Sequence, residues 1–108
     1  MIMSPEKLVR YCINMYNDMG KILIEKGLLA RAAEQVGRMS AVIDGISSST
    51  GIDYRAQIEH QVHCGSEFLQ SIDSLEDALE SGDPIAVEVE QEMFEAYAAQ
   101  TRLPCRKE

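Results

Sequence analysis

The chain contains no tryptophan, only three cysteines and no apolar run long enough to span a membrane. The three cysteines (Cys12, Cys64 and Cys105) form an odd set without a Cys-x-x-Cys motif, which excludes a disulfide framework and favours free thiols in a reducing compartment. The amino terminus lacks the basic and apolar regions of a secretory signal. We therefore expect a soluble, cytoplasmic protein with no membrane partner.

Basic residues are missing from a long part of the sequence. Between Ala56 and Thr101 there is no Lys or Arg, although eleven Asp and Glu residues fall there, and the whole chain has a net charge of −8. Such a chain would repel phosphates, which excludes nucleic acid as the expected partner. The acidic span predicts either a solvated face that keeps the protein soluble or a surface that attracts a basic partner.

Apolar residues are plentiful, at 45% of a 108-residue chain, and this predicts one packed domain over residues 1–101. Their three- and four-residue spacing is helical, and Ser4-Pro5, Gly27, the run from Ser47 to Gly51, and Gly82-Asp83-Pro84 mark helix ends. The predicted helices cover residues 5–26, 28–46, 53–81 and 84–101, followed by a frayed tail at 102–108. A seven-residue apolar repeat in the third helix favours an all-α, antiparallel four-helix bundle.

Two predicted helices have unusually wide apolar faces. On an ideal α-helix the apolar residues of the first helix spread over roughly 220°, more than one neighbour covers, and the last helix is similarly broad. A central position or a homodimer seam explains such faces, and so does a groove for an amphipathic segment of another protein. In the groove interpretation, the partner-binding residues are Tyr11, Met15, Met19 and Ile22 in the first helix, and Val87, Phe94 and Ala98 in the last.

One cluster carries ligand chemistry. His60 and Cys64 are four residues apart, as are His63 and Glu67, so each pair would share a face of a continuous helix and could bind a divalent metal. His60, His63 and Glu67 lie opposite the apolar seam of the same predicted helix, which favours a solvated face over a site. No phosphate-binding glycine loop, zincin motif or catalytic triad pattern is present, so we expect neither an enzyme nor a cofactor.

The order of these signals resembles a known family. The opening Ser4-Pro5-Glu6-Lys7-Leu8-Val9, the stretch from Ala41 to Ser49 and the turn at Glu80-Ser81-Gly82-Asp83 are similar to flagellin-specific export chaperones (FliS-like). The resemblance implies an antiparallel helical bundle that holds an export substrate, or that assists a chaperone which does.

The sequence therefore predicts a cytoplasmic, chaperone-like module that binds an amphipathic or disordered export substrate, or a co-chaperone, in an apolar groove. A homodimeric structural or regulatory bundle without a client is the first alternative. A metal-binding sensor or enzyme at His60, His63 and Glu67 is the second.

Overall fold

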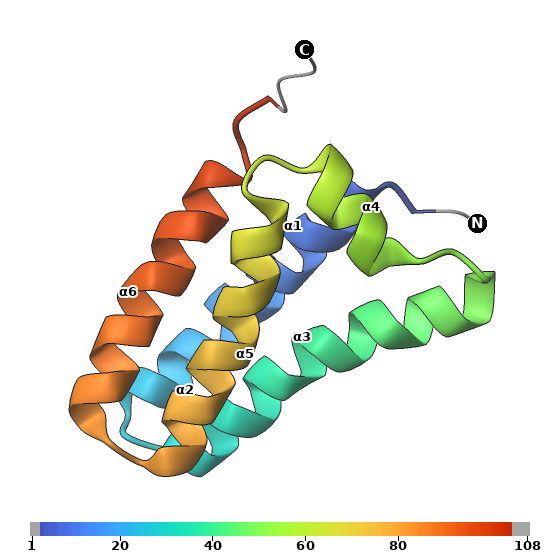
Figure 1. Ribbon diagram of the computed structural model, residues 1–108. Helices are drawn as coiled ribbons and strands as arrows, with labels where there is room; N and C mark the ends of the chain where they lie inside the picture. Colours follow the sequence, from blue (N-terminus) through green and yellow to red (C-terminus); the bar gives the residue numbers. More distant parts are fainter. Residues whose placement is uncertain (1–2, 105–108) are drawn as a thin grey trace.

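The computed structural model describes residues 3–104, and this part of the chain is helical with no strand, which confirms the all-α class. Three consecutive segments make up the N-terminal helix: α1 (Pro5–Met15), the π-helical segment η1 (Tyr16–Gly20) and α2 (Lys21–Glu25). They are followed by α3 (Leu29–Thr50), α4 (Tyr54–Gln61), α5 (Gly65–Ser81) and α6 (Pro84–Gln100). Figure 1 shows α5 between α3 and α6, and α5 makes extensive contacts with both.

The helix ends follow the predicted punctuation closely. The side chains of Ser4, Asp53 and Asp83 each accept a hydrogen bond from a backbone N–H in the first turn of the helix that follows. Gly27 and Gly82 adopt left-handed backbone angles just after α2 and α5, a conformation in which a side chain would be strained. These short motifs therefore predicted most of the helix boundaries correctly.

The serine run is an exception, because it is helical rather than a loop. The predicted helix 28–46 continues to Thr50 and ends at Gly51, whose φ is 73°. The hydroxyl groups of Ser47 and Thr50 donate to the carbonyl oxygens of Ile43 and Ile46, four residues earlier in the same helix. Hydroxyl side chains that bond to their own helix in this way remain compatible with it.

The predicted helix 53–81 is wrong as a single element, because it divides into α4 and α5. Val62 is extended, and Cys64 has a φ of 55°, which is rare for a residue with a side chain. At Gly65 the chain passes so close to α4 that a β-carbon would lie 2.0 Å from the carbonyl oxygen of Ile58. With α1, η1 and α2 counted as one helix, the described residues therefore form five helices where the sequence predicted four, and α4 contacts α1, α3 and α5.

The core lies where the helices converge. Tyr54, Phe68 and Phe94 are its largest fully buried side chains, and aliphatic residues of every α-helix except α2 surround them. The Tyr54 hydroxyl donates to the carbonyl oxygen of Met3 at 2.6 Å, which attaches the segment before α1 to α4.

The predicted tail at 102–108 is described only as far as Pro104, where it forms a turn and a bend. Residues 105–108 lie outside the described part.

Candidate partner-binding surface

The N-terminal helix changes its register at η1. The Lys21 N–H donates to the carbonyl oxygen of Tyr16, five residues earlier, instead of four as in an α-helix. This extra residue rotates everything that follows by about 100° relative to a uniform α-helix. The rotation turns Ile24 partly into the core while leaving Ile22 exposed. The predicted 220° apolar face therefore belongs to two helical stretches with different registers.

Four predicted partner-binding residues lie in this N-terminal helix, Tyr11 and Met15 in α1, Met19 in η1 and Ile22 in α2 beyond the register change. Tyr11, Met19 and Ile22 are exposed over 48%, 47% and 42% of their surfaces, and Met15 is partly buried. We call Tyr11, Met15, Met19 and Ile22 the N-terminal face. Its side chains are accessible to a partner, as the groove hypothesis requires.

The other three predicted residues are not on the surface, which corrects this half of the predicted site. Val87, Phe94 and Ala98 are buried in the core. The Phe94 ring centroid lies 4.6 Å from that of Tyr16 and 5.5 Å from that of Phe68, so it joins η1, α5 and α6. The wide apolar face of α6 has two sides, and the residues predicted to bind a partner lie on the side that faces inward.

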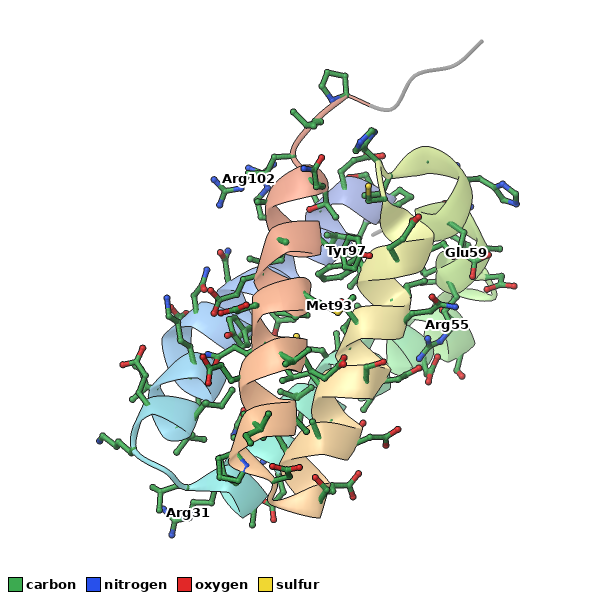
Figure 2. All side chains as sticks on the ribbon, turned by 60° about the vertical axis from the view of Figure 1, so that its left-hand side comes forward. Arg31, Arg55, Glu59, Met93, Tyr97 and Arg102 are labelled. Carbon is green, nitrogen blue, oxygen red and sulfur yellow. The ribbon has the colours of Figure 1, made fainter. Side chains whose placement is uncertain are left out.

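The outward side of α6 carries an exposed apolar row that was not among the predicted partner-binding residues. Ile85, Val89 and Met93 are spaced by four residues, so they share one side of the helix, and they are exposed over 74%, 49% and 43% of their surfaces. Tyr97 continues the row and is partly buried. Figure 2 shows Met93 and Tyr97 on the side of α6 that borders α5. We call Ile85, Val89, Met93 and Tyr97 the α6 stripe.

The charged residues around the α6 stripe all have the same sign. Every charged side chain in α5 and α6 is a carboxylate. The set comprises Glu67, Asp73, Glu76, Asp77 and Glu80 in α5, and Glu88, Glu90, Glu92 and Glu95 in α6. The stripe is therefore an exposed apolar row on an acidic part of the protein.

Where η1 meets α6, the protein's own side chains bridge the two helices. A separate hollow of about 410 Å³ lies between the end of the N-terminal helix and the start of α6, with Ile24, Val87 and Glu88 among its lining residues. The buried Tyr16 hydroxyl donates to a carboxylate oxygen of Glu95 and accepts a hydrogen bond from Gln91 Nε2 at 2.9 Å. Burial, and then the hydrogen bond to Glu95, raise the pKa of Tyr16 above its ordinary range, so the hydroxyl stays protonated. A hollow of about 200 Å³ remains above this link, with Asn17, Lys21, Glu95 and Arg102 among its lining residues. It is partly polar and does not form the predicted apolar groove.

The histidine cluster does not have the geometry that its spacing suggested. The helix break at residues 62–64 separates His60, at the end of α4, from Glu67, in the first turn of α5. The pairs four residues apart therefore do not share one helix face. Over residues 3–104 no group of three or more His, Cys, Asp or Glu side chains is placed to hold a metal ion.

The two described cysteines differ in accessibility. Cys12 is fully buried, and burial raises the pKa of its thiol to about 12, which makes it a poor nucleophile. Cys64 is partly exposed at the helix break. Cys105 lies outside the described residues.

No family model matches the chain, and neither the curated proteins nor the solved structures provide a match. The resemblance to flagellin-specific export chaperones therefore depends on the sequence motifs alone.

None of the helices described is both long enough and apolar enough to cross a membrane.

Proposed function

We propose that the protein is a cytoplasmic, chaperone-like binding module without catalytic activity, which holds an amphipathic or disordered segment of another protein. The α6 stripe is the observation that supports this function. Ile85 alone is exposed over 74% of its surface, and it begins a row of apolar residues that extends along the helix. In this proposal α1 to α2, α3, α5 and α6 act as the four members of an antiparallel bundle, with α4 at one end.

The spacing of the α6 stripe suits a helical partner. Residues at positions i, i+4 and i+8 form a ridge beside which the apolar face of a second helix can lie. Burying such a ridge contributes roughly 25 cal/mol for each Å² of apolar area, before the cost of ordering the partner is subtracted. Met93 adds a flexible, polarisable contact that adapts to partners of different shape. The resemblance to export chaperones adds the class of client, an export substrate such as flagellin or a co-chaperone complex.

Binding of a designed, uncharged amphipathic peptide tests this function. We expect the wild-type protein to bind the peptide, and the double variant Val89→Ser/Met93→Ser to bind at least about tenfold more weakly, because the ridge is lost. The double variant Met19→Ser/Ile22→Ser is the matched control, since its side chains are similarly exposed on the N-terminal face. Equal affinity of all three proteins would show that the α6 stripe is not the binding surface.

A homodimer without a client is the second candidate, and the N-terminal face favours it. Met19 and Ile22 are exposed beside residues of both charges, Asp18 and Lys21, so two copies can approach without net repulsion. Light scattering of the purified protein distinguishes the two candidates. A dimer that dissociates in the Ile22→Glu variant would support self-association, whereas a monomer at all concentrations would contradict it.

A further inference from the structure

We infer that the α6 stripe binds a basic amphipathic helix, one that carries Lys or Arg on both sides of its apolar face. This inference depends on the proposed function and specifies the chemistry of the partner. It follows from the charges that surround the stripe.

Carboxylates lie on both sides of the stripe. At 100° per residue, Glu88 and Glu92 fall on one side of the row formed by Ile85, Val89 and Met93. Glu90 falls on the other side, toward α5. Glu88 and Glu92 are exposed, and Glu90 is partly buried. A helix that lies on the apolar row therefore has its flanking positions over carboxylates.

No basic residue of α5 or α6 neutralises these carboxylates, because neither helix contains one. Figure 2 shows Arg31 and Arg102 at opposite ends of the molecule and Arg55 on the far side of α5. Arg55 is also already engaged, since its Nε lies 2.8 Å from an Asp44 carboxylate oxygen. Among the described residues the one ion pair is that of Arg55 with Asp44, so no ion pair engages Glu88, Glu90 or Glu92, and their charges are available to a partner.

An apolar row alone could contact several kinds of partner, and charge complementarity favours a basic helix among them. Long Lys and Arg side chains can cover apolar surface with their methylene groups and place their charges beside the carboxylates. A second copy that docks through the same stripe would bring two rows of glutamates together, and this repulsion opposes a symmetric dimer there. An anionic lipid surface is disfavoured for the same reason.

Three designed peptides of about 18 residues, each helix-forming and with the same apolar row, test the inference on the full-length protein. Lys flanks the row in the first peptide, Gln in the second and Glu in the third. Fluorescence anisotropy measures their affinities. We expect the Lys peptide to bind at least about tenfold more tightly than the Gln peptide, and the Glu peptide to bind most weakly. The advantage of the Lys peptide should shrink markedly between about 50 mM and about 500 mM NaCl, because salt screens exposed charges.

Two variants separate the contributions of charge and apolar contact. Glu88→Gln/Glu92→Gln should reduce the preference for the Lys peptide while leaving the affinity for the Gln peptide unchanged. Val89→Ser/Met93→Ser should weaken both peptides, and Met19→Ser/Ile22→Ser should weaken neither. Circular dichroism checks that each variant is folded.

The possible failures are distinguishable. Equal, salt-independent binding of all three peptides would overturn the basic-helix inference and leave the proposed function intact. No binding of any peptide would overturn both. A Lys peptide that binds Val89→Ser/Met93→Ser as tightly as wild type would place the binding elsewhere on the acidic surface and overturn the inference. If wild type forms a dimer and Val89→Ser/Met93→Ser abolishes it, a second copy of the protein covers the stripe. That result would also overturn the basic-helix inference.

Discussion

Gly65 permits the sharp turn between α4 and α5 because it has no side chain. A methyl group there would lie 2.0 Å from the Ile58 carbonyl oxygen and 2.7 Å from its carbon, and these backbone atoms cannot rotate away as a side chain would. We expect Gly65→Ala to lower the free energy of unfolding by about 3 kcal/mol or more, the upper range for overpacked sites. Urea denaturation measures this loss.

Gly45 provides the control for that prediction. It lies within α3, and a β-carbon there meets no atom within 4 Å. Gly45→Ala should therefore raise the free energy of unfolding by about 0.5–1 kcal/mol, because alanine loses less backbone entropy in a helix. If the two variants were equally stable, steric contact would not be the reason for glycine at position 65.

The buried thiol of Cys12 makes stability depend on alkaline pH. Its pKa rises from 9.0 to about 12 on burial, so above pH 9 the unfolded chain releases this proton while the folded protein retains it. Deprotonation then favours the unfolded state, and stability falls as the pH rises. Relative to Cys12→Ala, wild type should lose about 1 kcal/mol of unfolding free energy between about pH 8 and about pH 10. Parallel pH profiles of the two proteins would contradict this expectation.

At the scale of whole elements, the sequence predicted helix ends better than helix interiors. Ser4, Asp83 and Gly82 act within one turn, so their effects can be read from neighbouring residues alone. The helix break before Gly65 could not be predicted from neighbouring residues in this way. At this break the backbone of Gly65 comes close to the Ile58 carbonyl, and only the folded chain shows that contact. A glycine inside a predicted helix was the one available signal.

The π-helical segment is the second feature of a helix interior that composition does not encode. Its hydrogen bond joins the Lys21 N–H to the carbonyl oxygen of Tyr16, five residues earlier, whereas an α-helical bond joins residues four apart. Gly20 contributes to it locally, since a β-carbon at this position would lie 3.3 Å from Cδ1 of the Tyr16 ring. The Tyr16 ring is thus free to pack against Phe94 at the centre of the molecule.

Deleting the exposed Asp18 tests the role of η1. Without the extra residue the same N–H and carbonyl close an α-helical turn, and the residues after it keep their present orientation. Ile24 stays partly buried, so we expect the deletion to change the free energy of unfolding by less than about 1 kcal/mol. Insertion of one alanine after Asp18 is the matched control, because it rotates the following residues by about 100° and turns Ile24 outward, which should lower the free energy of unfolding by about 2 kcal/mol. Equal stabilities for the deletion and the insertion would show that the register after η1 is unimportant.

At the scale of the whole molecule, the sequence predicted the two apolar sides of the last helix but not which of them is exposed. Helical spacing placed Ile85, Val89 and Met93 on one side of the last helix, and Val87 and Phe94 on the other. Spacing alone does not say which side faces the core. The aromatic contact of Phe94 with Tyr16 and Phe68 decides this, and it joins residues that are far apart in the sequence. The choice between core and surface is therefore a property of tertiary packing.

The acidic half of the molecule also has an energetic consequence within the protein. The Glu76 carboxylate lies over Gly37 of α3, where a β-carbon would be 2.6 Å from its oxygen. Burial raises the pKa of Glu76, and the negative charges of Glu80, Asp73 and Asp77 raise it further. The folded protein therefore holds this proton more tightly than the unfolded chain, whose glutamates titrate near pH 4.5.

Mild acidification should consequently stabilise the protein. The stability linked to Glu76 is present at low pH and is lost as the pH rises through its raised pKa, so unfolding free energy should increase as the pH falls from neutral toward 4.5. Below the ordinary aspartate pKa of 3.8 the trend should reverse, because Arg55 holds the pKa of Asp44 below that value and protonation breaks the pair. Urea denaturation of wild type and Glu76→Gln across this range measures both effects. The variant should lack the increase that wild type shows as the pH falls toward 4.5 and should keep the decrease below pH 3.8, whereas an equal increase in both proteins would assign it to other carboxylates.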